Sequence, residues 1–143
     1  MTVNPISFVD EITNTTEKLY KGYEALQKME DVEVATTPKE LVFQKDKVKI
    51  YHYLREGVAV KCKIPVLVSF AMLNRHDVLD LQPDKSLMKK FVDLGLDVYI
   101  MDWGYPTQAD KYLTMEDYID GYMNDAVDFV RKRHKVEKIH KMA

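Results

Sequence analysis

Apolar side chains near the start of the chain recur at every third or fourth position. Between residues 7 and 30 this spacing places them on one face of a helix, so the pattern predicts an amphipathic helix. Gly22 weakens that helix locally. Packing of the stripe on its own domain is the more common arrangement, and docking on a partner helix is the alternative. The stripe comprises Val9, Ile12, Thr16, Leu19, Tyr23, Leu26 and Met29.

The spacing of apolar side chains changes after the segment Thr-Thr-Pro at residues 36–38. Pro38 could open one helical turn, because a proline at the first helical position loses no hydrogen bond. Residues 42–53 then alternate between apolar and polar side chains, interrupted by a polar turn at residues 45–47. This alternation predicts a hairpin of two half-solvated strands.

Two apolar runs, at residues 64–70 and 96–101, lack that alternation and predict strands buried on both faces. Between them, Ser86 offers a helix start, and Gly95 stands where a left-handed residue ends a helix. Thr114 begins a further helix, and residues 136–143 begin another strand. The alternation of strands and helices predicts an α/β fold, with a mainly parallel sheet covered by helices on both faces.

Composition narrows the class of protein. The 143 residues include 21 basic and 23 acidic side chains, so the chain has no overall charge that would attract nucleic acid or an anionic membrane. The single cysteine, Cys62, cannot close an intrachain disulfide, which favours the cytoplasm. No apolar run approaches the roughly 20 residues of a membrane-spanning helix. We therefore expect a cytoplasmic protein with no membrane span and no nucleic-acid partner.

Candidate chemistry lies in two loops, because ligands of open α/β sheets bind beyond the carboxyl ends of the strands. The loop at residues 73–79 contains Asn74, Arg75, His76 and Asp77, a set that can orient an anionic or carbonyl substrate but can also be merely solvated. The second loop, at residues 102–107, contains Asp102 and Trp103.

Other classes of site lack their usual signals. No glycine-rich phosphate cradle follows either strand, and the four histidines have no short ligand spacing, so we expect no cofactor and no metal. Cys62 stands just before a strand, whereas a nucleophile of an α/β fold follows one, and we interpret it as structural. Its two lysine neighbours, which could lower its pKa, keep a reactive thiol as the alternative.

Three segments, VLVSFAMLNR at 66–75, VLDLQPDKSL at 78–87 and GLDVYIMDWGYP at 95–106, closely resemble polyhydroxyalkanoate synthases, above all the catalytic subunit of the two-subunit type. Shorter matches, TPKE at 37–40, KVKIY at 47–51 and DYIDGY at 117–122, follow the same family in the same order. The likeness therefore extends over essentially the whole chain.

The resemblance implies an α/β-hydrolase core in which a cysteine attacks the thioester of a hydroxyacyl-coenzyme A. The family's nucleophile follows the strand that residues 136–143 begin, in a G-x-C-x-G turn, and its aspartate and histidine come later. Residues 36–143 would then be the N-terminal half of that domain, ending before the nucleophile, with residues 1–35 as a helix and linker. No catalytic side chain carries over. The family's oxyanion loop corresponds to the backbone N–H of Leu73 or Asn74, whereas His76 and Asp77 replace aromatic residues and receive no role.

Two hypotheses of function follow. The first is that the chain is the N-terminal part of such a synthase, inactive alone, whose partners are a second synthase subunit or further copies of itself at the surface of polyester granules. The second is a non-catalytic, synthase-like interaction protein that binds a synthase or a granule protein through the helix at residues 7–30.

Overall fold

The computed structural model describes residues 5–27 and 34–143 and divides the chain into two units, Met1–Val32 and Glu33–Ala143. The first unit contains helix α1, Pro5–Gln27, which confirms the helix predicted from the apolar stripe. All of its described side chains, from residue 11 to 24, are exposed, including Ile12, Leu19 and Tyr23. The side chains of Val9 and Leu26, and all of Met29, lie outside the described part. No described helix is long and apolar enough to cross a membrane.

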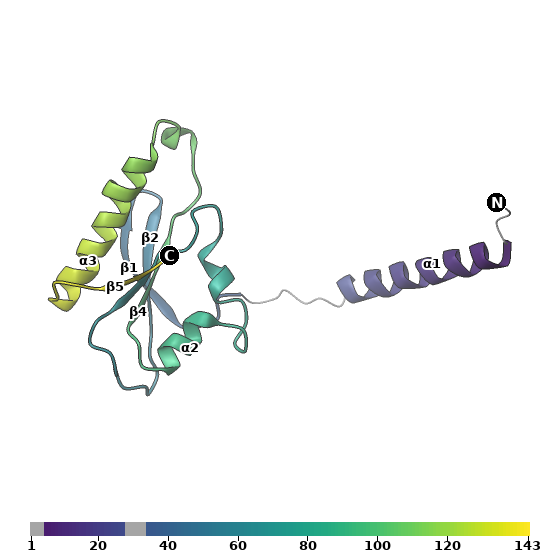
Figure 1. Ribbon diagram of the computed structural model, residues 1–143, viewed down its shortest axis with the longest axis horizontal. Helices are drawn as coiled ribbons and strands as arrows, with labels where there is room; N and C mark the ends of the chain where they lie inside the picture. The colour runs from purple at the N-terminus through teal and green to yellow at the C-terminus, as the bar shows by residue number, and fades with distance from the viewer. Residues whose placement is uncertain (1–4, 28–33) are drawn as a thin grey trace. The chain divides into compact units, whose positions relative to one another are not determined.

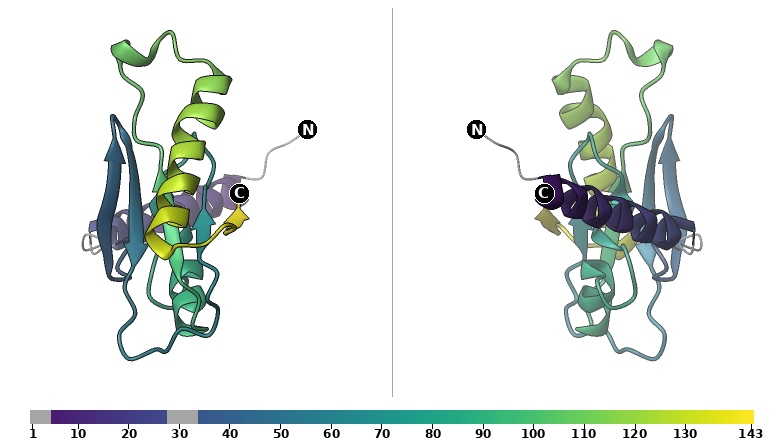
Figure 2. Two further views of the ribbon diagram at one scale, coloured as in Figure 1. Left: turned by 90° about the vertical axis from the view of Figure 1, so that its left-hand side faces the viewer. Right: turned by 90° about the vertical axis from the view of Figure 1, so that its right-hand side faces the viewer.

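The second unit is built on a five-stranded sheet in the order β1-β2-β4-β3-β5 (Figure 1). Strand β2 pairs antiparallel with both β1 and β4, whereas β3 runs parallel to both β4 and β5. The sheet is therefore mixed, and the prediction of a mainly parallel sheet was wrong, because the β1–β2 hairpin adds two antiparallel pairs at one margin (Figure 2). The strands are β1 Lys39–Lys45, β2 Val48–Tyr53, β3 Val66–Val68, β4 Val98–Asp102 and β5 His140–Met142.

Helices cover both faces of the sheet, as the alternation of elements predicted. Helix α2, Leu87–Asp93, packs on one face through Met88 and Val92, against Val98 and Ile100 of β4. Helix α3, Asn124–His134, covers the other face through Ala126 and Val130, against residues of β4 that include Tyr99. Successive residues of β4 thus serve opposite faces, which is why this strand is almost entirely apolar.

Local signals place the helix ends where the sequence suggested. The Ser86 hydroxyl accepts the Lys89 N–H at 2.8 Å and caps α2, and Gly95 follows that helix with a φ of +85°. Thr114 and Asp117 exchange side-chain and backbone hydrogen bonds at the start of the last helix. That helix passes through a π-helical segment, η3 (Asp117–Met123), before α3.

Three predicted boundaries were wrong. Pro38 opens no helical turn, because Lys39 and Glu40 already pair with β2 as the start of β1. Strand β3 is shorter than the apolar run at residues 64–70, and the Phe70 carbonyl accepts the Trp103 indole N–H instead of pairing with a strand. Strand β5 begins at His140 rather than at residue 136, because Lys135 ends α3 in the left-handed conformation and a connection intervenes. Two short 3₁₀ turns complete the unit, η1 (His76–Leu79) and η2 (Gln108–Asp110).

Candidate functional site

A cavity of about 380 Å³ lies at the carboxyl edge of the sheet. Because β3, β4 and β5 are parallel, their carboxyl ends meet at this edge, and the loops after β3 and β4 form the cavity walls. Both loops that the sequence singled out are therefore brought together at one site. The lining residues come from these loops at 72–76 and 102–106, from Lys47 in the hairpin turn and from Tyr118 in η3.

The loop after β3 is held on two sides. The Ser69 N–H donates to the Met142 carbonyl of β5 at 2.8 Å, and the Trp103 indole N–H donates to the Phe70 carbonyl at 2.7 Å. A turn follows in which the Asn74 N–H donates to the Ala71 carbonyl at 3.1 Å. The loop therefore leaves the sheet in a fixed direction.

The two backbone amides predicted as candidate donors differ in this turn. The N–H of Asn74 is already engaged with Ala71, whereas the N–H of Leu73 has no acceptor among the described residues. The Leu73 side chain is 99% exposed. Of the two, Leu73 alone offers a free donor at the cavity.

His76 pairs across the cavity wall with Asp102, the last residue of β4. Its Nδ1 lies 3.5 Å from Asp102 Oδ2, and its ring stacks on Tyr51 with centroids 5.2 Å apart. The other oxygen of Asp102 accepts the Gly104 N–H at 3.0 Å. Burial lowers the pKa of His76, although the Asp102 carboxylate acts in the opposite direction. The imidazole is therefore neutral at neutral pH.

This pair was missed by sequence reasoning, which left His76 and its neighbour Asp77 without a role. Asp77 is buried, and its carboxylate instead forms an ion pair with the Arg75 guanidinium at 2.6 Å. A signal was present in the sequence, since Asp102 ends a predicted strand and His76 follows the neighbouring one. Pairing them required knowing that β3 and β4 are adjacent and parallel.

The opposite wall of the cavity is fixed by the hairpin turn. Lys47 Nζ lies 3.0 Å from Asp110 Oδ1 and donates to the Tyr118 hydroxyl at 2.5 Å. Gly104 adopts a φ of +66°, and a Cβ there would lie 2.4 Å from the Lys47 carbonyl oxygen. The turn and the loop after β4 are therefore in backbone contact, which only glycine permits.

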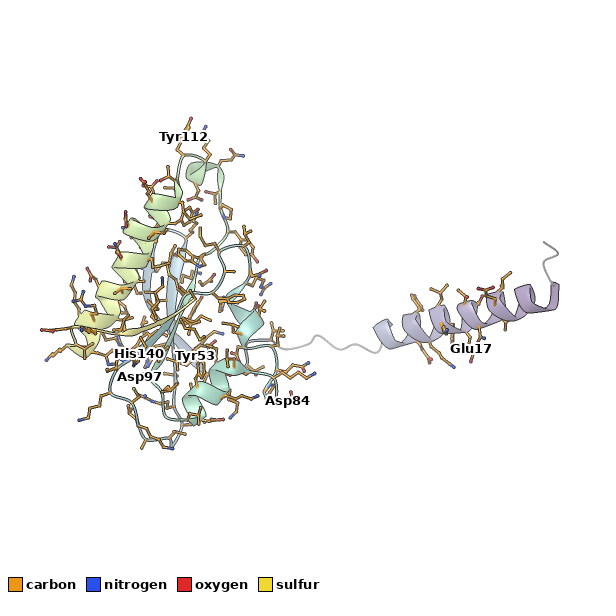
Figure 3. The ribbon with its side chains drawn as sticks, in the orientation of Figure 1. Glu17, Tyr53, Asp84, Asp97, Tyr112 and His140 are labelled. Carbon is orange, nitrogen blue, oxygen red and sulfur yellow. The ribbon has the colours of Figure 1, made fainter. Side chains whose placement is uncertain are left out.

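Histidines also gather at the amino end of β4. His52 Nε2 lies 2.7 Å from Asp97 Oδ1, and His134 Nε2 lies 3.5 Å from Asp97 Oδ2 and 2.7 Å from the Tyr99 hydroxyl. Figure 3 shows Asp97 toward the opposite end of this unit from Tyr112. These residues lie outside the cavity lining. The described residues hold no group of three or more histidine, cysteine, aspartate or glutamate side chains arranged for a metal.

Cys62 is half-buried, and its sulfur lies 3.5 Å from the Ile64 carbonyl oxygen. It belongs neither to the cavity lining nor to either histidine cluster. Its interpretation as a structural residue stays a prediction.

Comparison with known proteins identifies the family. The sequence model of the poly-beta-hydroxybutyrate polymerase (PhaC) N-terminus matches residues 4–91. A poly(3-hydroxyalkanoate) polymerase subunit PhaC from Synechocystis is 45% identical over 131 residues, which are 90% of this chain and 34% of the relative. Subunits of the same name from Allochromatium vinosum and Thiocystis violacea are 38% and 36% identical, and each match covers 96% of this chain and 39% of the relative.

The chain thus spans between a third and two fifths of the length of these relatives. The match to the family model covers more than half of the chain, from before α1 to within α2. The loop after β4, which forms part of the cavity wall, lies beyond this match but within the part of the chain aligned with the relatives. The chain belongs to the family of poly-beta-hydroxybutyrate polymerase N-terminal regions.

Proposed function

We propose that this chain is the N-terminal part of the catalytic domain of a polyhydroxyalkanoate synthase. Such an enzyme is an acyltransferase that joins hydroxyacyl groups from coenzyme A into polyester through a cysteine thioester. In this proposal residues 36–143 are the first half of an α/β-hydrolase core. The nucleophile, the aspartate and the histidine come from sequence that follows residue 143, so the chain alone turns over no substrate.

The position of β5 beside β3 carries the proposal. The two strands are parallel, and Met142 O accepts the Ser69 N–H at 2.8 Å, at the root of the loop that contains Leu73. A nucleophile on a sharp turn directly after β5 would therefore emerge next to this loop. In α/β-hydrolases one oxyanion donor comes from the residue after the nucleophile and the second from the loop after an adjacent strand. The free N–H of Leu73 fits the second role.

A chimera tests the proposal. The 143 residues are joined to the part of the Synechocystis relative that follows its aligned region, and release of free coenzyme A from 3-hydroxybutyryl-coenzyme A is measured. We expect the chimera to release coenzyme A and to form polymer, and the 143-residue chain alone to do neither. A well-folded chimera without turnover would contradict the proposal.

Two variants of the chimera test the oxyanion donor. Leu73→Pro removes the N–H, whereas Leu73→Ala keeps it and removes only an exposed side chain. Loss of one such donor lowers kcat by about 100-fold or more. We expect that loss for Leu73→Pro and nearly unchanged kcat for Leu73→Ala. Equal kcat values in the two variants, with the fold intact by circular dichroism, would remove Leu73 from the site.

The exposed apolar side chains of α1 favour a second candidate, a synthase-like interaction protein. Ile12, Leu19 and Tyr23 are each more than half exposed and recur at helical spacing. In that case the 143-residue chain binds an intact synthase, and replacing Ile12 and Leu19 with serine abolishes binding. An active chimera together with no such binding would favour the first candidate.

A further inference from the structure

One ring nitrogen of His76, in the cavity lining, faces a carboxylate, and the other has no partner in the described part of the chain. His76 Nδ1 faces the Asp102 carboxylate at 3.5 Å, which favours the tautomer with the proton on Nδ1. Nε2 then carries the lone pair, and no donor in the described part of the chain reaches it. An imidazole nitrogen with a free lone pair accepts a hydrogen bond from an O–H or N–H group.

Contacts on both partners of this pair limit how the ring can move. Tyr51 stacks on it with an interplanar angle of 16°, so the ring cannot tilt freely. Asp102 is itself fixed, because its second oxygen accepts the Gly104 N–H at 3.0 Å. A carboxylate that orients an imidazole fixes the direction in which the other ring nitrogen points. The acceptor is therefore preorganised for a ligand.

The charges of the cavity decide which ligand it suits. Lys47 is compensated by Asp110 at 3.0 Å, and Arg75 is compensated by Asp77 at 2.6 Å. Both cations that line the cavity therefore already face a carboxylate, and the charge of Lys39 near His76 is balanced by Asp80, Asp77 and Asp102. The Asp102 carboxylate would also repel an anion beside His76. The cavity thus favours a neutral ligand that donates a hydrogen bond.

We propose that His76, oriented by Asp102, binds the hydroxyl group of a hydroxyacyl ligand by accepting its O–H hydrogen bond at Nε2. The identity of the acyl group rests on the proposed function, and the preference for a hydroxyl rests on the cavity. A carbonyl at the Leu73 N–H and a hydroxyl at His76 would then be recognised from two elements of one cavity. His76 is a binding residue in this proposal, and no bond is made or broken at it.

Two neutral esters that differ by one hydroxyl test the proposal on the 143-residue chain. Methyl 3-hydroxybutanoate and methyl butanoate are titrated separately, and binding is followed by the ring signals of His76 in ¹H–¹³C NMR spectra. One hydrogen bond between neutral groups corresponds to about a threefold to tenfold difference in Kd. We expect the hydroxy ester to bind more tightly by that factor and to shift the His76 ring signals more.

Variants distinguish the effect of the ring nitrogens of His76 from the effect of its stacking on Tyr51. His76→Phe keeps a ring to stack on Tyr51 and removes both nitrogens, and its binding is followed by the Trp103 indole signal. We expect its Kd for methyl butanoate to stay within twofold and its preference for the hydroxy ester to vanish. Asp102→Asn, which can still accept the Gly104 N–H, is expected to reduce the preference. His140→Gln, at an exposed histidine of β5, is the matched control and keeps it.

Equal Kd values for the two esters in the unaltered chain, or no binding of either, would overturn the proposal. A preference that survives in His76→Phe would overturn it as well. These outcomes are independent of the chimera. Turnover by the chimera without a hydroxyl preference in the cavity rejects only the role of His76, and a preference in the 143-residue chain without turnover rejects only the synthase assignment.

Discussion

Strand β4 has an aspartate at each end, and each aspartate faces histidine. Asp97, just before the strand, contacts His52 at 2.7 Å, Arg55 at 3.4 Å and His134 at 3.5 Å. Asp102, the last residue of the strand, faces His76 at 3.5 Å and accepts the Gly104 N–H. The Asp97 side chain is 9% exposed and the Asp102 side chain is 24% exposed. The same two residue types therefore form a packed network at one edge and a partly open pair at the other.

The partners of the two aspartates explain the difference. The Asp97 network joins β1, β2, β4 and α3, because Glu40 contacts both His52 and Arg133 at 3.4 Å. Burial alone would raise the pKa of Asp97, but the hydrogen bond from His52 and the charge of Arg55 lower it below the usual value. Such a network stabilises the docking of α3 on the sheet. A histidine–aspartate pair indicates binding only where, as at Asp102, a cavity adjoins it.

Substitution of each aspartate is the strongest test of whether the two ends of β4 differ in structural role. Asp97→Ala removes the hydrogen-bond partner of His52 and the carboxylate that Arg55 and His134 face, and we expect a loss of about 3 kcal/mol in the free energy of unfolding. Asp102→Ala removes one hydrogen bond at a partly exposed site, and we expect a loss of about 1 kcal/mol or less. Urea unfolding followed by far-ultraviolet circular dichroism measures both. Equal losses would mean that both edges have the same structural role.

Glycine substitutions test how rigid the cavity wall beside Asp102 is. In Gly104→Ala the new Cβ meets the Lys47 carbonyl oxygen at 2.4 Å, at a φ of +66°. Gly57→Ala is the matched control, because Gly57 has a φ of +72° but nothing within 4 Å of a Cβ. We expect the control to lose about 1 kcal/mol through backbone strain alone, and Gly104→Ala to lose about 2 to 3 kcal/mol.

The same urea titration gives both values, and ester binding reports on the wall itself. Gly104→Ala is expected to weaken binding of both esters, because the loop after β4 must move away from the hairpin turn. If the two alanine variants are equally stable and bind equally well, then the contact between Gly104 and Lys47 contributes nothing.

Elements with strong periodicity were predictable from sequence, and long-range pairings were not. The stripe that gave α1, the cap at Ser86 and the left-handed Gly95 depend only on neighbouring residues. The position of β5 against β3 depends instead on residues about 70 positions apart, as in the Val66–His140 pair. Periodicity carries no information about such pairings.

The candidate site shows the same limit. Sequence identified both loops, because polar residues follow predicted buried strands. It could not choose between Leu73 and Asn74, since that choice depends on a turn in which one amide is used internally. It paired no histidine with Asp102, because His76 and Asp102 are 26 positions apart and only the β3–β4 register brings them together.

The smallest expected effect is the pH dependence of stability, which compares His134 at the packed edge with His76 at the cavity. Burial lowers the pKa of both, against the charge of Asp97 for His134 and of Asp102 for His76. Other charges face each ring, with His52, Arg133 and Arg55 around His134 and Lys39, Asp77 and Arg75 around His76.

A histidine with a lowered pKa stays neutral in the folded chain at a pH where the unfolded chain binds a proton. The contribution of this histidine to the free energy of unfolding is therefore fully present above the unfolded pKa of about 6.5, and it is lost as the pH falls below that value. We expect the free energy of unfolding to decrease between pH 7.5 and 5.5, and to decrease less in His76→Phe and in His134→Gln. Asp97 adds a separate loss below pH of about 4, because its pKa is lowered. A stability that rises on acidification through this range would mean that the imidazoles are charged in the folded chain, and the neutral acceptor at His76 would then have no basis.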